Sequence, residues 1–307
     1  MFFHTENNFN GWLCLDKPAG ISSNFAMLKV RKILRQKTGY VGTLDPFATG
    51  VLPIAVGEAK KFIRFIEDSD KKYVFTVSFG VATDSVDKDG RIVARTSKIP
   101  SKDDILKVID EFHGEIEQIP PIFSAIKIRG KRACDRARNG ESLRMPSRKV
   151  NIFSIKMMEE NLEDGEATFK VSCSKGTYIR SLARDMAEKV GSLGYVKSLR
   201  RSKSGFFSLK DSISLEKLIK MGDTAQMADI LIPLERPLDD IPALNLGDRD
   251  IGMLRNGLRL TIKKEEVFSS EVRIFDDVNQ RFHGIGFVSS NGELKVVRMC
   301  IRNWGII

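Results

Sequence analysis

Asp45 lies in the stretch GTLDPFATG, residues 42–50, between two glycines and directly before a proline. The residue before a proline is pushed out of the helical region, and glycines let the backbone turn sharply or lie against another segment. The stretch therefore predicts a rigid loop that presents one carboxylate, a group able to act as a nucleophile or a general base. An ordinary Asp-Pro turn is the alternative interpretation of this stretch alone.

Arg180 breaks a local rule. If Thr177 caps a helix over 178–190, this arginine lies in the first turn of that helix. A cation there is unfavourable by about 0.3–1 kcal/mol, because the helix N-terminus carries a partial positive charge. Local rules tend to be broken at functional positions. We therefore expect an anionic partner from outside the helix, either a phosphate or a carboxylate such as Asp45, with an unpaired exposed arginine as the alternative.

The sequence contains no motif that predicts a metal site or a nucleotide-binding site. It contains neither a GxGxxG nor a GxxxxGK[ST] motif, so dinucleotide and P-loop sites are not predicted. The cysteines and histidines are too scattered to form metal-ligand pairs, and we interpret the cysteines as reduced thiols of a cytoplasmic chain. These residues are Cys14, Cys134, Cys173, Cys300, His4, His113 and His283.

The charge distribution indicates a polyanionic partner. The net charge is +10, and nearly all of the excess lies before Asp240. A basic face of this kind is typical of nucleic-acid binding, although a merely soluble basic surface is the alternative. No apolar run approaches the roughly 18 residues that span a bilayer, and the N-terminus lacks the pattern of a signal peptide. We therefore expect no membrane association.

The elements that must position Asp45 and Arg180 alternate between strands and helices. Period-2 and helical spacings, with their caps and turns, predict a strand from residue 12, a helix over 23–37 with a basic face, a short helix over 58–67, a strand over 73–81, a turn at 87–90, a helix after residue 101, a strand over 166–173 and a helix over 178–190. The stretch SLRRSKSGFFSL, 198–209, is interpreted as a basic turn leading into a strand. A helical stretch over 214–231, a proline-bearing connector and several short strands over 244–307 follow.

Residues 119–149 differ from the rest of the chain. Basic side chains are dense there, two prolines precede them, and little of the segment could form a core. We expect a protruding arm that grips RNA, with a solvated insertion as the alternative.

Taken together, these stretches resemble the TruB-type tRNA pseudouridine synthases. GTLDPFATG carries the resemblance, supported in family order by LDKPAGISS, DSDKKYVF, QIPPIFSAIKIRGKR, CSKGTYIRSLARD and YVKSLRR. The resemblance implies an α+β fold with a mixed, mainly antiparallel central sheet flanked by helices. It further implies a catalytic domain over 1–238, with the RNA-gripping insertion at 119–149, and a small β-rich PUA-like domain over 239–307.

The resemblance also implies roles for individual residues. Asp45 matches the catalytic aspartate, Arg180 the arginine that pairs with it, and Tyr73 the tyrosine that stacks on the target uracil. Leu199 matches an apolar pocket residue. Lys61 matches a lysine close to the site, and Lys17 belongs to a Lys-Pro element that supports the loop; both are expected among the substrate-binding residues.

Two positions depart from the family pattern. Tyr40 stands where the family usually has a histidine that wedges into the folded RNA loop; a tyrosine ring can stack there but does not protonate near neutral pH. In the basic arm, Cys134 stands where a tyrosine is common. We retain Tyr40 as a substrate-binding candidate.

The implied activity is isomerisation of uridine to pseudouridine at position 55 in the TΨC arm of tRNA. No hydride moves, so the reaction needs no cofactor. The expected partner is tRNA, with the chain acting as a monomer and without a protein partner. The alternatives are a non-catalytic tRNA-binding or tRNA-folding protein and a synthase that acts on another RNA.

Overall fold

A computed structural model describes residues 9–141, 143–222, 225–262 and 269–300. Within them, ten strands form a mixed sheet in the order β14-β1-β3-β12-β4-β11-β10-β7, with β2 beside β3 and β13 beside β12. Within this sheet, only β1/β14 and β3/β12 pair in parallel. This confirms the expected mixed, mainly antiparallel sheet. The strands are β1 (Gly11–Lys17), β2 (Thr38–Tyr40), β3 (Thr49–Val56), β4 (Lys71–Phe79), β7 (Gly114–Gln118), β10 (Arg148–Asn161), β11 (Glu166–Cys173), β12 (Gly194–Ser204), β13 (Phe207–Ser208) and β14 (Ile213–Ser214).

The two halves of the sheet meet where β3 touches β12. Only two residue pairs join these strands, Thr49 with Arg200 and Gly50 with Arg201. Gly50 has a φ of +103°, and a Cβ at this position would lie 2.2 Å from the carbonyl oxygen of Arg201. A glycine is therefore required for the close approach. The loop that carries Asp45 enters β3 directly at this junction.

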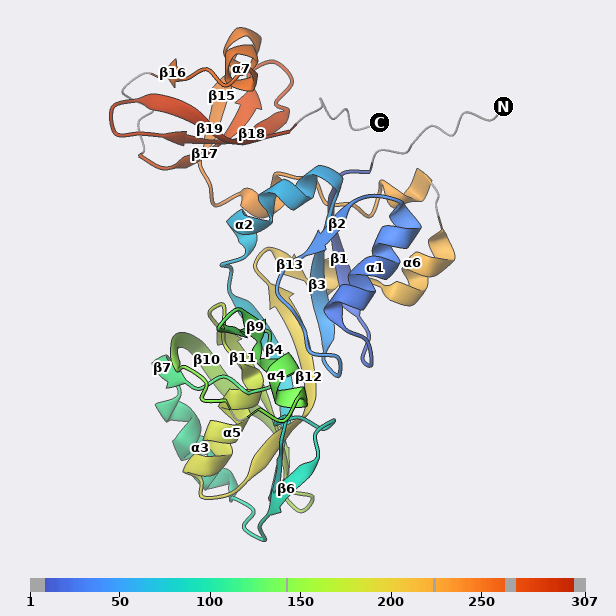
Figure 1. Ribbon diagram of the computed structural model, residues 1–307, viewed down its shortest axis with the longest axis vertical. Helices are drawn as coiled ribbons and strands as arrows, with labels where there is room; N and C mark the ends of the chain where they lie inside the picture. The colour runs from blue at the N-terminus through green and yellow to red at the C-terminus, as the bar shows by residue number, and fades with distance from the viewer. Residues whose placement is uncertain (1–8, 142, 223–224, 263–268, 301–307) are drawn as a thin grey trace.

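Helices cover the two halves separately (Figure 1). α1 (Ser23–Leu34) and α6 (Leu215–Met221) pack beside β1 and β2, whereas α3 (Lys102–Glu111) and α5 (Ile179–Lys189) pack beside β10 and β12. α1 begins where the Ser22 hydroxyl accepts a hydrogen bond from the Phe25 N–H, a standard N-cap. The shared core is aromatic and aliphatic, with the rings of Phe75 and Phe169 stacked 5.4 Å apart.

Two excursions from the sheet flank the junction. One is the hairpin of β5 (Val81–Thr83) and β6 (Ile92–Arg95). The other follows β7 and contains β8 (Lys127–Ile128), β9 (Lys131–Arg132) and α4 (Ala133–Arg138). The second excursion is the segment predicted as a protruding arm. Its first residues instead pack against the start of α5, and its last two, Arg148 and Lys149, belong to β10.

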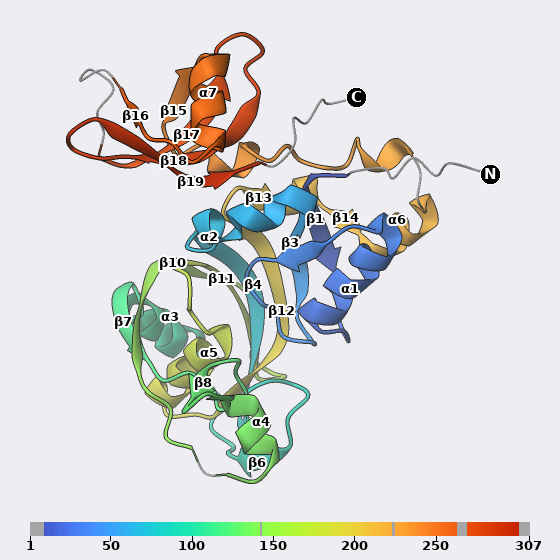
Figure 2. The ribbon, with the colours of Figure 1, turned by 45° about the horizontal axis from the view of Figure 1, so that its top comes forward.

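The C-terminal part forms its own five-stranded sheet, in the order β15-β17-β18-β19-β16 (Figure 1). It packs on η1 (Gly57–Phe62) and α2 (Ile63–Ile66) through an apolar cluster that includes Trp12, Phe62 and Ile285. The Phe62 and Phe282 rings lie 5.3 Å apart, and Figure 2 shows this sheet beside α2. The expected small β-rich, PUA-like domain is confirmed, while its boundary at 239 stays a prediction. The elements are β15 (Ala243–Leu246), α7 (Asp248–Arg255), β16 (Leu260–Thr261), β17 (Glu271–Asp276), β18 (Phe282–Val288) and β19 (Glu293–Met299).

Two sequence predictions were wrong. The basic stretch from 198 is not a turn: β12 continues through it to Ser204, because cross-strand packing on β4 outweighs its density of charge. The helix predicted over 214–231 is also too long. It ends after Met221, where Gly222 takes a φ of +62°. Positions 223–224 of that prediction lie outside the described residues, as do His4 and the ends of the predicted domains, 1–8 and 301–307. No helix among the described residues is both long and apolar enough to cross a bilayer.

Candidate active site

A cavity of about 1070 Å³ opens at the sheet junction. Its walls come from the loop before β3, from β4 and β12, from the two excursions and from the start of α5. Four of the predicted site residues line it: Asp45, Tyr73, Arg180 and Leu199. Side chains that are far apart in the sequence, such as Asp45 and Arg180 at a separation of 135 positions, therefore converge on one hollow.

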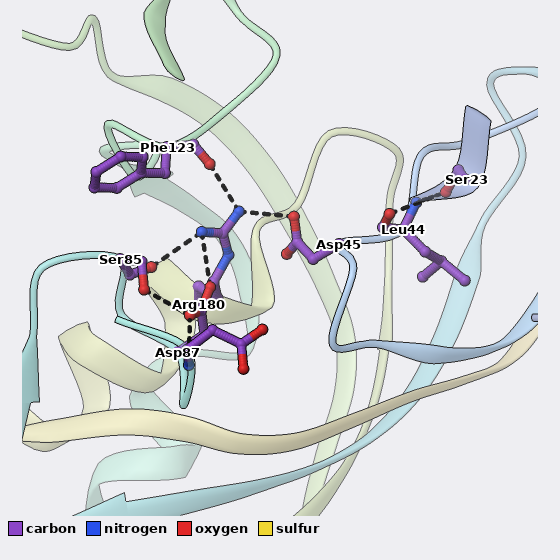
Figure 3. A network of polar contacts seen from close by, with 8 residues as sticks. Ser23, Leu44, Asp45, Ser85, Asp87, Phe123 and Arg180 are labelled. Atoms are coloured by element: carbon purple, nitrogen blue, oxygen red, sulfur yellow. Dashed lines mark hydrogen bonds and ion pairs between the residues drawn. The ribbon is translucent and has the colours of Figure 1, made fainter. Parts of the chain in front are cut away.

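Hydrogen bonds from Ser23 and Gly20 hold the loop that presents Asp45. The Ser23 hydroxyl donates to the Leu44 carbonyl at 2.9 Å and accepts from the Leu44 N–H at 2.8 Å (Figure 3). The Gly20 N–H donates to the Pro46 carbonyl at 2.9 Å. These bonds fix the backbone on both sides of Asp45, so the rigid loop expected from the sequence is present.

Lys17 lies beneath this loop and not in the cavity. Its side chain is fully buried, and its ammonium donates to the carbonyls of Pro18 at 2.8 Å, Ile21 at 2.8 Å and Pro46 at 3.2 Å. Burial lowers the pKa of Lys17 to about 8. Because an ammonium has three donors and all three are used, the geometry fits the expected support of the loop and leaves no donor for a substrate.

Arg180 reaches the Asp45 loop from the first turn of α5. Tyr178, and not Thr177 as the sequence suggested, occupies the N-cap position, and it makes no side-chain cap bond. The Thr177 hydroxyl donates to the Ser174 carbonyl. The Arg180 Nη2 donates to Asp45 Oδ1 at 2.8 Å and to the Phe123 carbonyl at 2.9 Å. The sequence predicted an anionic partner outside the helix, and this carboxylate is in that position.

Asp87 is a second carboxylate on Arg180 that sequence reasoning missed. Arg180 Nη1 donates to Asp87 Oδ2 at 3.2 Å and to the Ser85 carbonyl at 3.0 Å (Figure 3). Asp87 is buried and is itself oriented by the Ser85 hydroxyl, which donates to its Oδ1 at 2.5 Å. The sequence DKDG had been interpreted only as a turn. Nothing in the local pattern distinguishes a turn aspartate that points outward from one that points inward.

The charge state of Asp45 is set by opposing effects. Its side chain is 31% exposed, so one part faces the cavity while the walls enclose the rest. This enclosure raises the pKa of Asp45, the Arg180 guanidinium opposes the rise, and Asp87 adds to it. An adjacent cation by itself lowers a carboxyl pKa, but at this site the desolvation of Asp45 is the larger effect. The guanidinium thus limits a pKa that the cavity pushes upward.

Tyr73 and Leu199 form the apolar side of the cavity. Tyr73 on β4 lies opposite Arg201 on β12, and Leu199 lies opposite Phe75. Both side chains are buried, at 8% and 7% exposure, with an edge open to the hollow. Burial raises the pKa of the Tyr73 hydroxyl. The pair therefore offers a ring face and an aliphatic wall, which suits a planar, weakly polar group.

Two predicted substrate residues do not reach this hollow. The Lys61 ammonium is bonded to Glu58 Oε2 at 2.6 Å and to the Met299 carbonyl at 3.4 Å, so it faces the C-terminal sheet. Tyr40 is half-buried on β2, where it pairs with Ile54 of β3. Neither residue lines the cavity.

The structure adds residues that the sequence did not single out. The Tyr178 ring lines the cavity with the Arg148 guanidinium 5.3 Å from its centre. Lys71 and Arg201 are buried in the floor beside Tyr73. Cys134 of α4, one of the two positions that depart from the family pattern in the sequence, also lines the cavity. Residues such as these are found only once strand register is known. Among the described residues, no cluster of His, Cys, Asp and Glu side chains is arranged to hold a metal ion.

Comparison with known protein families gives matches along most of the chain. Residues 30–179 match the family described as TruB family pseudouridylate synthase (N terminal domain). Residues 180–239 match the tRNA pseudouridylate synthase B C-terminal domain, and residues 242–300 match the family described as Pseudouridine synthase II TruB, C-terminal.

Curated relatives are similar over most of their length. The tRNA pseudouridine synthase B of Zymomonas mobilis is 45% identical over 257 residues, covering 82% of this chain and 84% of that protein. The protein of the same name from Caulobacter vibrioides is 42% identical over 259 residues, covering 84% and 83%.

Solved structures share the fold. A Cbf5-Nop10-Gar1 complex contains a chain with a TM-score of 0.69 and 23% identity, covering 94% of this chain and 84% of that one. An H/ACA RNP bound to a substrate RNA containing 2′-deoxyuridine gives a TM-score of 0.72 at 22% identity, covering 99% and 88%. At these identities the likeness concerns architecture alone.

Proposed function

This chain belongs to the TruB family of pseudouridine synthases, and on that premise we propose that it converts uridine to pseudouridine at position 55 in the TΨC arm of tRNA. The family membership rests on the sequence matches. The choice of substrate position and the roles of individual residues are the proposal.

The reaction breaks the bond between uracil N1 and the ribose C1′, turns the base, and forms a bond between C5 and C1′. The proton on C5 leaves to solvent, and N1 gains one. Asp45 supplies the carboxylate that starts this sequence, as a nucleophile at C1′ or C6 or as a base at C2′. Arg180 orients Asp45 and opposes the rise in its pKa, which favours the ionised form.

The substrate must bring its base out of a stacked RNA loop, at a cost of a few kcal/mol. Tyr73 offsets part of this cost by stacking on the uracil, a contact worth roughly 1–3 kcal/mol. Leu199 keeps the far side of the base dry and free of hydrogen-bonding groups, so that the detached ring can turn. The two side chains border the same hollow as Asp45, which supports this division of roles.

Basic residues outside the cavity supply the phosphate contacts in this proposal. Lys29, Arg31 and Lys32 of α1 are exposed and no acidic residue lies in that helix. Such contacts make affinity fall steeply with salt. We further propose that Tyr40 stacks on RNA outside the catalytic hollow, and that the chain acts in the cytoplasm as a monomer without a protein partner.

The observation that carries the proposal is the 2.8 Å contact between Arg180 Nη2 and Asp45 Oδ1 at the edge of the cavity that Tyr73 and Leu199 also line. It unites a carboxylate, its orienting cation, a stacking ring and an apolar wall within reach of one nucleotide. A protein that only bound tRNA would have no need for a partly enclosed carboxylate in that position.

The test is tritium release from tRNA transcribed with C5-labelled uridine, with the purified chain as the only protein. We expect release of the label from one uridine per tRNA. A transcript with cytidine at position 55 is the matched control and should release none. Release that persists with this control would assign the activity to another position, and no release from either transcript would refute the proposed reaction.

A further inference from the structure

Arg201 is one of the largest fully buried side chains in the molecule, with an exposure of 1%. No ion pair joins it to any carboxylate of the described residues, whereas Arg180 has two such partners. A buried guanidinium without a counter-charge is costly unless its donors are well used. Its position therefore calls for an explanation from its hydrogen bonds.

The guanidinium joins the two ends of the Asp45 loop. Its Nη2 donates to the carbonyl of Gly42 at 2.8 Å, and its Nε donates to the carbonyl of Val51 at 2.7 Å. The donors of an arginine lie in one rigid plane, so a single side chain fixes the separation of these carbonyls. Asp45 lies between them in the sequence, so these two bonds hold both ends of the segment that carries it.

Gly42 leaves room for the Arg201 guanidinium because it has no side chain. It has a φ of +70°, and a Cβ at this position would lie 3.0 Å from Arg201 Nη1. The first glycine of GTLDPFATG thus serves both the turn and the close approach of the arginine. The loop and the buried side chain fit each other at the floor of the cavity, where Gly42 and Arg201 both belong to the lining.

The backbone of Arg201 ties the same point to Tyr73. Arg201 pairs with Gly50 of β3 on one side and with Tyr73 of β4 on the other. Burial raises the pKa of the Tyr73 hydroxyl, while the charge and hydrogen bonding of Arg201 oppose that rise. One residue therefore contacts the loop of the carboxylate and lies beside the stacking tyrosine.

We propose that Arg201 is a positioning residue that holds Asp45 and Tyr73 in register across the sheet junction, an inference that rests on the proposed function of those two residues. It touches no substrate. Its role is to keep the carboxylate and the aromatic ring at a fixed separation while RNA enters and leaves, and a displacement of about 1 Å at a reacting group can cost about 100-fold in rate.

Three variants test this role. Arg201→Met removes both clamping bonds and the charge, and Arg201→Lys keeps the charge but lacks the rigid planar fork that spans the two carbonyls. Arg184→Met is the matched control, because Arg184 also donates to a main-chain carbonyl, that of Ile119 at 3.0 Å, but lies outside the cavity lining. Each variant is examined by amide hydrogen exchange of residues 42–51 and by kcat and KM for tritium release.

We expect exchange in 42–51 to be at least about tenfold faster in Arg201→Met, since a hydrogen bond from a charged donor contributes about one to two orders of magnitude to an equilibrium. The kcat should fall about 100-fold with KM within threefold of the wild type. Arg201→Lys should be intermediate in both, and Arg184→Met should match the wild type.

Wild-type exchange in 42–51 for Arg201→Met, or equally faster exchange in every segment, would overturn the proposal. If Arg201→Met does not fold, Arg201→Lys decides by the same exchange measurement, and an unchanged 42–51 segment overturns the clamp. A wild-type chain that releases no tritium while Arg201→Met still loosens 42–51 would refute the proposed reaction and support the clamp.

Discussion

Replacing Arg180 with methionine should move the acid limb of the pH–rate profile to higher pH. Arg180 Nη2 lies 2.8 Å from Asp45 Oδ1, and the cavity already raises the pKa of that carboxyl. Without the guanidinium, the charge of Lys17 is left to oppose burial and the charge of Asp87. The pKa of Asp45 must therefore rise further, and a reaction that needs the carboxylate must lose rate from the acid side.

The size of the shift follows from the geometry. Two unit charges about 4 Å apart interact by about 4 kcal/mol at an effective dielectric constant near 20. Water screens part of this, because the Asp45 side chain is 31% exposed. An opposite charge at this range lowers a carboxyl pKa by about 1–3 units. We therefore expect the acid limb to move up by at least one pH unit, with kcat at pH 7 reduced about 100-fold through the additional loss of orientation.

The assay is tritium release measured from pH 5.5 to 9 under kcat and kcat/KM conditions, with tRNA binding measured in parallel. Arg180→Lys is the matched variant: it keeps the charge, so its acid limb should stay close to that of the wild type while kcat falls. Breaking a buried ion pair costs about 3–5 kcal/mol, so thermal unfolding must first show that Arg180→Met is folded at the assay temperature.

An unchanged acid limb together with a matching loss of tRNA affinity would refute the reasoning. That result would make Arg180 a phosphate contact, the alternative that the sequence left open. A shift of the acid limb to lower pH would also contradict the account, because the loss of a nearby positive charge raises a carboxyl pKa.

Other expectations follow from the same contacts. Gly50→Ala should destabilise the fold by about 3 kcal/mol in urea unfolding, since its Cβ would lie 2.2 Å from the Arg201 carbonyl oxygen. Gly114→Ala is the control, because open space surrounds Gly114, and it should cost about 1 kcal/mol. Equal costs for the two variants would contradict the close approach of Gly50 to Arg201. Tyr73→Leu should lower kcat/KM for tritium release roughly 5- to 150-fold, because stacking on the uracil is lost. Tyr73→Phe keeps the ring and should therefore keep the contribution of stacking to kcat/KM. Identical losses in the two variants would exclude stacking. Burial lowers the pKa of Lys17 from 10.5 to about 8, so between these pH values the unfolded chain binds more protons than the folded chain. The free energy of unfolding of the wild type should therefore rise with pH across this range, relative to that of Lys17→Met. Urea midpoints that run parallel for the two proteins would contradict this prediction.

The sequence predicted those parts of the site that local rules could reveal. The bracketing glycines and the proline marked the Asp45 loop, and the unfavourable place of Arg180 in its helix predicted a distant anion. Their joining at 2.8 Å required the structure, because no local pattern specifies which loop faces which helix. The resemblance named the same pair, since a family signature carries long-range information that propensities lack.

The residues whose positions the sequence did not predict share one feature. Asp87 looked like any turn aspartate, and Arg201 lay in a stretch interpreted as a basic turn. Their burial depends on how β12 pairs with β3 and β4, and register is a property of the whole sheet. The same limit applies to Lys61, whose contact with the Met299 carbonyl depends on where the C-terminal sheet docks.

The central claim is that the Asp45 carboxylate performs chemistry on a uridine held in this cavity. Tritium release by Asp45→Asn tests it most directly, because the substitution keeps the size of the side chain and removes only its charge. The account predicts release at background level with a tRNA Kd within threefold of the wild type. Turnover close to that of the wild type would contradict it.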